Sequence, residues 1–414
     1  MVCCSEGDSE FSPGFPPREP TAAPSGRRTI QKCHFTRAIM DESSTVSLIK
    51  KRPLRFHWSM SSVGEKWKGA KSRTAQNGIP DLEAHVDFCR RAEACGIDSV
   101  LTAFGFHRAD PIVLASALGV LTTKIKFMIA VRSGICSPTV LVQQVNTLSA
   151  LTNGRICLNV VGGHTPNEQK GYGDFLSHDD RYARTDEFLT VCRAFWEGDG
   201  PVNFKGNYYH IENGRLNTPF VAPDRSGPEI FLGGSSPQAF GLAARHAHCL
   251  WTLPRRPEEM AKQITAVLES ETEVGILVSM IARPSRKEAL SAAQSVLAAV
   301  GDRARKTHQD FSRASDSVAF TSTLALAEES SSDWLTPWLW TGAVPYLGAP
   351  AIALVGSYDE VTDGILEFTK AGVTQFLFLG WPDVPEMTAF NQEVRPRVLA
   401  QYEAGLDISV RGRI

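Results

Sequence analysis

The chain has 414 residues, of which 43% are hydrophobic and 21% are charged, so it is long enough for one large folded domain or two ordinary ones. Its formal net charge of −2 at pH 7 gives no reason to expect nucleic acid or an anionic membrane surface as a partner. The nine cysteines are scattered and form neither a Cys-x-x-Cys pair nor a Cys/His metal spacing. This pattern predicts reduced thiols, a cytoplasmic location and no metal site.

The first fifty residues differ from the rest in composition. They are rich in Ser, Pro, Gly and charge and lack apolar periodicity, which predicts a disordered N-terminal extension at 1–50. They contain no apolar core of a secretory signal, and Glu6, Asp8, Glu10 and Glu19 argue against a transit peptide. We expect the folded domain to span residues 51–405, followed by a C-terminal tail at 406–414.

Short apolar runs alternate with helical patterns along this domain. Eight runs have the length and composition of buried strands: 54–60, 97–105, 125–134, 155–163, 229–234, 248–254, 274–283 and 374–382. Strands that alternate with helices imply a parallel sheet with right-handed crossovers, and eight such units predict a closed (β/α)8 TIM barrel with insertions. A doubly wound open sheet is the alternative. In a barrel, functional residues lie after the carboxyl ends of the strands.

The uncharged run at 334–358 is long enough to cross a membrane. However, Pro337, Pro345 and Pro350 interrupt it, which favours a loop followed by a short strand "AIALVG" over a membrane span.

The turn at Gly233, Gly234, Ser235 and Ser236 stands between the fifth strand and the next helix. One interpretation is a tight turn with Ser as the helix N-cap. The other is an anion site, because a helix N-terminus offers free N–H groups and glycines allow a phosphate to approach. The position at a late strand end of a barrel favours the anion site.

Five segments, taken together, resemble the luciferase-like flavin monooxygenases, and within them the alkanesulfonate monooxygenase branch. They are 137–163, 178–189, 204–216, 231–247 and 353–386, within a resemblance that runs from about 55 to 402. The resemblance implies a barrel that binds reduced FMN, supplied by a separate flavin reductase, and activates dioxygen (O2) as a flavin peroxide. It also implies a homodimer or tetramer.

The resemblance further implies that Tyr182, Ser235 and Ser236 hold the FMN phosphate and that Asn159 lies beside the flavin ring. The full expected cofactor-binding set is Ala103, Asn159, Gly162, His164, Tyr182, Gly234, Ser235 and Ser236. The structural alternatives are a core tyrosine, two N-cap serines and a turn asparagine.

The chain departs from the sulfonate oxidisers of the family at the sulfonate contacts. Leu277, Ser279 and Leu347 replace an arginine, a histidine and a lid arginine, while Trp381 replaces a tyrosine and Arg108 a cysteine. Burying a sulfonate without cations is unfavourable, so we expect an apolar or carbonyl-bearing organic substrate and not a small alkanesulfonate. The expected substrate pocket is Trp58, Phe104, Phe106, Leu277, Ser279 and Leu347, and the catalytic candidates are His107, Arg108 and Trp381.

The sequence therefore predicts a two-component FMN-dependent monooxygenase. The insertion between strands seven and eight, at about 282–347, is expected to form a mobile lid whose polar part is 312–333. No second GxGxxG nucleotide motif follows any strand, so NAD(P)H binding is not expected. Two alternatives stay open: an F420-dependent oxidoreductase on the same barrel, and a barrel that binds flavin without catalysis.

Overall fold

The computed structural model describes residues 52–60, 80–106, 108–163, 165–329, 332–381 and 383–411. The predicted extension at 1–50, the end of the tail at 412–414, His107 and His164 lie outside the described residues.

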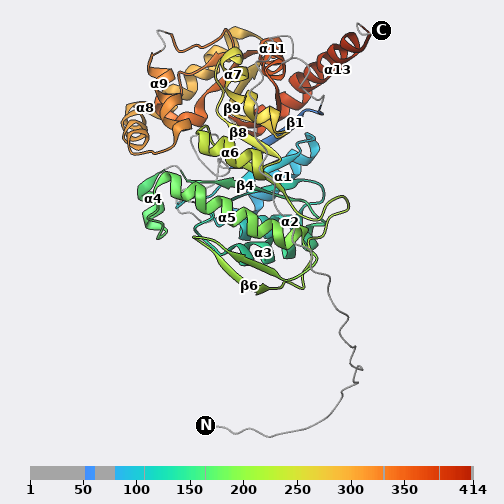
Figure 1. The fold of residues 1–414 in the computed structure, drawn as a ribbon. Helices are drawn as coiled ribbons and strands as arrows, with labels where there is room; N and C mark the ends of the chain where they lie inside the picture. Colours follow the sequence, from blue (N-terminus) through green and yellow to red (C-terminus); the bar gives the residue numbers. More distant parts are fainter. Residues whose placement is uncertain are drawn as a thin grey trace, which may run out of the picture. The chain divides into compact units, whose positions relative to one another are not determined.

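Eight parallel strands close into a barrel (Figure 1). Each pairs with the next around the ring, and the last strand pairs with the first. In ring order they are β1 (Arg55–Ser59), β2 (Ser99–Thr102), β3 (Lys126–Val131), β4 (Ile156–Val161), β7 (Glu229–Gly233), β8 (Cys249–Thr252), β9 (Glu273–Arg283) and β12 (Val373–Gly380). The predicted TIM barrel is confirmed, with one strand in each of the eight apolar runs.

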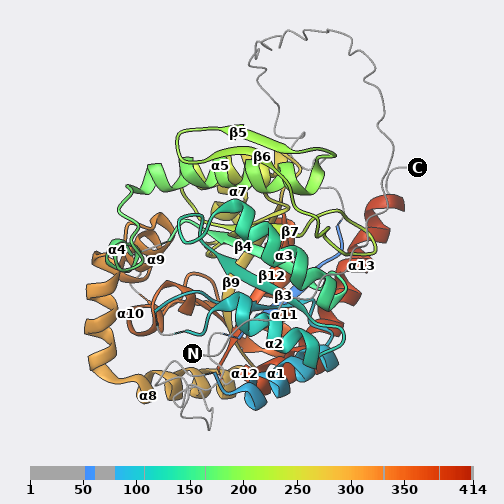
Figure 2. The same ribbon diagram turned by 90° about the horizontal axis from the view of Figure 1, so that it is seen from below.

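Helices surround the strands (Figure 2). Those of the barrel and its C-terminal end are α1 (Leu82–Ala94), α2 (Pro111–Leu121), α3 (Pro138–Thr152), α4 (Pro166–Gly171), α5 (His178–Glu197), α6 (Pro237–His246), α7 (Pro257–Glu269), α11 (Tyr358–Lys370), α12 (Asp383–Ala389), the π-helical turn η5 (Phe390–Val394) and α13 (Arg395–Arg411). A small antiparallel hairpin, β5 (Val202–Lys205) with β6 (His210–Gly214), follows α5. The expected tail from 406 is thus helical as far as Arg411.

Local sequence signals set where these helices begin and end. Helix α3 begins after Ser137, whose side chain accepts the N–H of Val140, and Pro138 occupies its first position. It ends at Asn153, which adopts the left-handed conformation with φ of 52°. These two caps fix where α3 begins and ends, and so they set the lengths of the turns that join it to β3 and β4.

Strand β9 has a different set of neighbours along its two halves. On one edge it pairs with β12 from Val274 to Met280. It also pairs with β8 over residues 273–276, and then with β11 (Ala353–Ser357) over residues 279–283. Strand β11 corresponds to the predicted short strand "AIALVG".

The insertion between β9 and β12 is mainly helical before it reaches β11. It contains α8 (Arg286–Arg313), α9 (Val318–Glu329), β10 (Leu339–Trp340), α10 (Val344–Leu347) and the 3-10 turn η4 (Ala349–Ala351). The stretch 312–333, expected to be the polar part of a mobile lid, contains α9, from which Ala319 and Leu324 pack inward. Within the described residues, no helix is long and apolar enough to cross a membrane.

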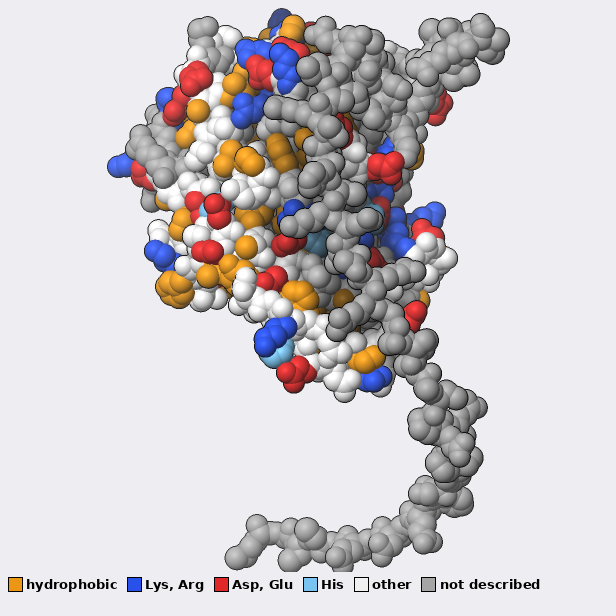
Figure 3. Space-filling model, viewed as in Figure 1, with side chains coloured by type: hydrophobic (Ala, Val, Ile, Leu, Met, Phe, Trp, Pro, Cys, Tyr) orange, Lys and Arg blue, Asp and Glu red, His pale blue; other side chains and the backbone are white. Residues whose placement is uncertain are grey.

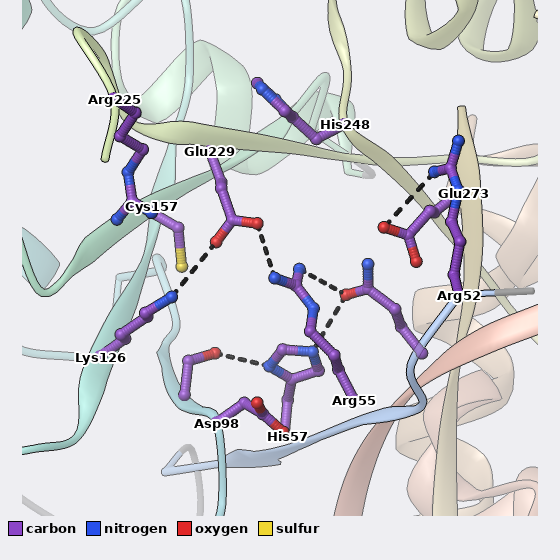
Figure 4. A network of polar contacts seen from close by, with 12 residues as sticks. Arg52, Arg55, His57, Asp98, Lys126, Cys157, Arg225, Glu229, His248 and Glu273 are labelled. Carbon is purple, nitrogen blue, oxygen red and sulfur yellow. Dashed lines mark hydrogen bonds and ion pairs between the residues drawn. The ribbon is translucent and has the colours of Figure 1, made fainter. Parts of the chain in front are cut away.

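The first residues of the strands form a buried polar network at the amino-terminal end of the barrel (Figure 4). Arg55 lies 2.6 Å from Glu229 and donates to Gln375 Oε1 over 3.0 Å. His57 Nε2 lies 3.0 Å from the same oxygen, so this nitrogen carries the proton, while Nδ1 accepts from Ser99. Burial, followed by the charge of Arg55, lowers the pKa of His57 to about 3, so the ring is neutral.

Charges of both signs are interspersed over the described part of the face shown in Figure 3. This face therefore carries no extended field of one sign, in keeping with the near-neutral net charge.

Candidate active site

A cavity of about 160 Å³ lies at the carboxyl ends of the strands, with residues of β4, β7, β8 and β9 in its wall. One end is polar and holds Gly162, Tyr182 and the turn of residues 233–236. The other end is apolar and includes Leu101, Leu253, Leu277, Leu377 and Phe320. Ligand sites of barrel enzymes occupy this face.

The glycine–serine turn forms the polar end because β7 stops at Gly233 and α6 starts at Pro237. Ser236 is the N-cap of α6, and its hydroxyl accepts the N–H of Ala239 over 3.2 Å. The Ser235 hydroxyl lies 2.7 Å from that of Thr252 on β8. Both serines line the cavity, so Ser236 caps α6 and also forms part of the cavity wall.

Tyr182 reaches this turn from helix α5. A side chain on Gly234 would place its Cβ 2.9 Å from the tyrosine hydroxyl, and one on Gly162 would place it 3.4 Å from the ring. The two glycines therefore let the ring lie against both strand ends. Burial raises the pKa of Tyr182, and a hydrogen bond with Ser236 opposes that rise. The phenol is thus a neutral donor beside the helix start.

Two buried polar atoms on cavity-lining residues lack a hydrogen-bond partner. They are Asn159 Oδ1 on β4 and Trp251 Nε1 on β8. An unpaired buried polar atom costs about 1–3 kcal/mol, so a ligand with both donors and acceptors would relieve this cost. A flavin ring carries both, and a phosphate suits the turn at the other end. The residues present therefore fit FMN.

Six predicted cofactor residues line the cavity: Asn159, Gly162, Tyr182, Gly234, Ser235 and Ser236. Ala103 does not line this cavity, and neither do Phe104, Phe106 or Arg108. Phe104 and Phe106 instead contact Tyr172 at centroid distances of 5.0 and 4.7 Å, and Phe106 is 52% exposed. Phe104 also packs against the buried cluster of Leu101, Trp251 and Leu377, so it lies next to residues of the cavity wall.

Of the predicted substrate residues, only Leu277 lines the cavity. Trp58 points outward from β1 and packs against Phe378 and Phe390, because its neighbours His57 and Ser59 occupy the inward face. The Ser279 hydroxyl donates to the carbonyl of Pro350. Neither Trp58 nor Ser279 lines this cavity.

Leu347 and Trp381 lie in a separate apolar cluster of the insertion. They pack with Ile281, Trp340 and Ala351, between β9, α8 and β11, and do not line the cavity. Trp381 is buried and its Nε1 has no partner. The side chain of Trp381, a predicted catalytic residue, therefore does not contribute to the wall of this cavity.

Sequence reasoning missed several residues of the wall: His178, Trp251, Thr252 and 317–320. Trp251 was hidden in a strand that is apolar on both faces, and 317–320 were assigned to a mobile lid. It also missed Arg181, which is 3% exposed and donates to the Gly162 carbonyl over 2.8 Å. The adjacent "RY" pair at 181–182 was a signal, but only the tyrosine was selected.

Among the described residues, no three His, Cys, Asp or Glu side chains are grouped so that they would hold a metal ion. The cavity wall likewise contains no Lys or Arg side chain within the part of the chain that the structure describes. An anionic substrate group beside Leu101, Leu277 and Leu377 would therefore find no Lys or Arg side chain in this wall.

The chain thus forms a closed (β/α)8 barrel with a mixed polar and apolar cavity at the carboxyl ends of its strands, the face at which enzymes of the TIM-barrel class bind their ligands. The family model described as luciferase-like monooxygenase matches residues 54–375. The chain therefore belongs to the luciferase-like monooxygenase family and is an enzyme of that family, as its sequence motifs predicted.

Several solved structures share this fold at low sequence identity. A long-chain alkane monooxygenase (LadA) aligns with a TM-score of 0.69 and 19% identity, over 85% of this chain and 92% of that one. An EDTA monooxygenase (EmoA) from Chelativorans sp. BNC1 gives 0.66 and 20%, over 84% and 94%. An F420-dependent secondary alcohol dehydrogenase gives 0.61 and 20%, over 84% and 99%. These similarities show the fold and do not single out the alkanesulfonate branch.

Proposed function

We propose that the protein is an FMN-dependent monooxygenase that oxygenates an apolar or carbonyl-bearing organic compound, with reduced FMN supplied by a separate flavin reductase. The observation that supports the proposal is the cavity lining, which combines the glycine–serine turn at the start of α6 with a set of apolar side chains. In this reading Tyr182, Ser235 and Ser236 bind the phosphate.

The remaining wall residues then have separate tasks. Asn159 Oδ1 and Trp251 Nε1 orient the flavin ring, since each lacks a partner in the protein. Reduced FMN, when bound, supplies the electrons that activate dioxygen. Leu101, Leu277 and Phe320 exclude water from the chamber. The absence of Lys and Arg from the described wall supports an uncharged substrate over a small alkanesulfonate.

Flavin titration followed by fluorescence tests this proposal. The double variant Ser235→Ala with Ser236→Ala removes two hydroxyls from the turn, and hydrogen bonds to charged groups contribute about 1.5–3 kcal/mol each. FMN affinity should fall about tenfold or more. Ser137→Ala is the matched control, because Ser137 caps α3 in the same way but does not line the cavity.

The outcome that contradicts the proposal is equal FMN affinity in wild type and double variant. A parallel titration with F420 tests the alternative of an F420-dependent oxidoreductase. Tighter binding of F420 than of FMN would support that alternative. Tight binding of reduced FMN that leads to no substrate oxygenation under dioxygen would indicate a non-catalytic barrel.

A homodimer is part of the proposal. Helices α2 and α3, with 11 and 15 residues, contain no Asp, Glu, Lys or Arg, although 21% of the chain is charged. Their exposed apolar side chains include Val113, Val120 and Leu151, which are 69%, 60% and 56% exposed. An uncharged apolar face is self-complementary and suits a second copy of the same chain.

A further inference from the structure

A single guanidinium, that of Arg181, joins three separate segments around the polar end of the cavity. Arg181 Nε donates to the Gly162 carbonyl over 2.8 Å, and Nη1 donates to the Leu176 carbonyl over 3.0 Å. Nη2 lies 2.6 Å from Asp316 Oδ2, in an ion pair between residues 135 positions apart. The Arg181 side chain is 3% exposed, so the arrangement is buried.

Each of the three segments contributes to the cavity wall directly beside its bond to Arg181. Gly162 itself lines the cavity. His178 follows Leu176 by two residues and lines it as the first residue of α5. Ser317 and the next three residues follow Asp316 and line it as the start of α9. Arg181 is thus placed behind the wall and does not line the cavity itself.

Asp316 gives the insertion a polar contact with the barrel, beside the apolar packing of Ala319 and Phe320 against Leu253. Its Oδ1 has no partner, so the carboxylate is held by Arg181 alone among the described residues. The following Ser317 accepts the N–H of Phe320 over 3.5 Å, so the first turn of α9 starts directly from the ion pair. Figures 1 and 2 both show α8, α9 and α4 on the same side of the barrel.

A second buried pair on the same helix provides a comparison. Arg184 binds both oxygens of Asp174, at 3.0 and 2.6 Å. Asp174 is 3% exposed and precedes α5 by only a few residues, so this pair is local and does not reach the insertion. The two pairs are chemically alike, but only the Arg181 pair connects α5 to α9.

We propose that Arg181 is a positioning residue that assembles the phosphate end of the flavin site and makes flavin binding and docking of α9 mutually dependent. The inference rests on the proposed FMN site for its ligand, and on the Arg181 contacts for its coupling. If the ion pair keeps α9 against the wall, then FMN that contacts the assembled wall must strengthen that docking. Thermodynamic linkage makes the effect reciprocal, so loss of the ion pair must lower the affinity for FMN.

Amide hydrogen exchange over 314–322 tests the coupling, with FMN and with riboflavin, which lacks the phosphate. In the wild type, FMN should slow exchange in this segment more than riboflavin does. Asp316→Asn removes the charge and keeps the shape, so exchange should be faster without ligand, the extra protection by FMN should disappear, and FMN affinity should fall about fivefold or more. Asp316→Glu retains the carboxylate and should restore part of both effects.

Asp174→Asn is the matched control, since it breaks the local pair and leaves the link to α9. It should lower thermal stability without removing FMN-dependent protection at 314–322. Equal exchange at 314–322 in Asp316→Asn and Asp174→Asn without ligand would overturn the positioning role of Arg181. Unchanged FMN affinity and protection in a folded Asp316→Asn would overturn the coupling.

Failure of the proposed function gives a different result. If the wild type binds no FMN, the flavin half of this inference is refuted together with that function. The comparison of Asp316→Asn with Asp174→Asn without ligand still decides whether Arg181 positions α9.

Discussion

Leu277 and Ser279 lie two residues apart on the same strand, but their side chains reach different surroundings. Leu277 lines the cavity, whereas the Ser279 hydroxyl donates to the Pro350 carbonyl over 2.9 Å. The difference arises where β9 acquires β11 as a neighbour, because Ser279 is already paired with Ala353. Of Leu277, Ser279 and Leu347, the positions at which the resemblance implies a lost sulfonate contact, Leu277 is the one that lines this cavity.

A cation at position 277 should change the ligand preference. Leu277→Arg places a guanidinium in the apolar chamber, so binding of an apolar ligand should weaken and binding of a short alkanesulfonate should become measurable. Leu277→Met keeps the volume and is the control. Calorimetric titration with ethanesulfonate in the presence of FMN measures the effect. Strong sulfonate binding by the wild type would show that a cation reaches the substrate from elsewhere.

The Tyr182 hydroxyl should discriminate FMN from riboflavin. Tyr182→Phe removes a donor beside Gly234 and Ser236, and a hydrogen bond to a charged group contributes about 1.5–3 kcal/mol. FMN affinity should fall about tenfold or more, while riboflavin affinity should stay the same. The control is Tyr209→Phe, whose hydroxyl donates to the Ser133 carbonyl and does not line the cavity. An equal loss of affinity for FMN and for riboflavin would show that Tyr182 does not bind the phosphate.

Glu386 should make stability fall as pH rises. It is fully buried, and burial raises its pKa from 4.5 to about 7, although Arg283 opposes the rise and Asp383 adds to it. The folded state binds more protons than the unfolded state between these values, so the free energy of unfolding decreases from about pH 4.5 to 7. Relative to Glu386→Gln, the wild type should lose stability between pH 5 and 7.5 in urea unfolding.

Glu360 supplies a control of the opposite sign. Burial would raise its pKa, but hydrogen bonds from the Ser357 backbone and Arg286 lower it below 4.5. The stabilisation is present above pH 4.5 and is lost as pH falls through the folded pKa. Between pH 5 and 7.5, Glu360→Gln should therefore differ from wild type by a constant amount. A flat profile for the Glu386 pair would show that this carboxyl is ionised throughout.

Charges on helix α2 should dissociate the proposed dimer. Val113→Glu with Val120→Glu places like charges opposite each other across a two-fold axis, and multi-angle light scattering should change from dimer to monomer. Phe175→Glu, which also replaces a strongly exposed apolar residue, should leave the mass unchanged. A wild type that is monomeric at micromolar concentration would contradict the assignment of this face.

The barrel and its glycine–serine turn were predictable because their signals are local. Alternating strands and helices indicate the fold, and Gly233 to Ser236 form one continuous turn. Which face a residue occupies was harder to predict, because β1 is buried on both sides and Trp58 has no polar alternation to orient it. The role of Arg181 could not be predicted from local sequence patterns, because its partner Asp316 lies 135 positions further along the chain.

The change of neighbours along β9 separates the upper wall of the pocket from the hydrogen-bonded ring of the barrel. Strand β8 ends beside Ile276 and β11 begins beside Ser279, so Leu277 lies where one wall strand gives way to another. The lower wall of the cavity consists of residues on the barrel strands. The upper wall includes residues 317–320 of the insertion. Substitutions in the insertion are therefore free to reshape the chamber above Leu277 while the hydrogen-bonded ring beneath it stays intact.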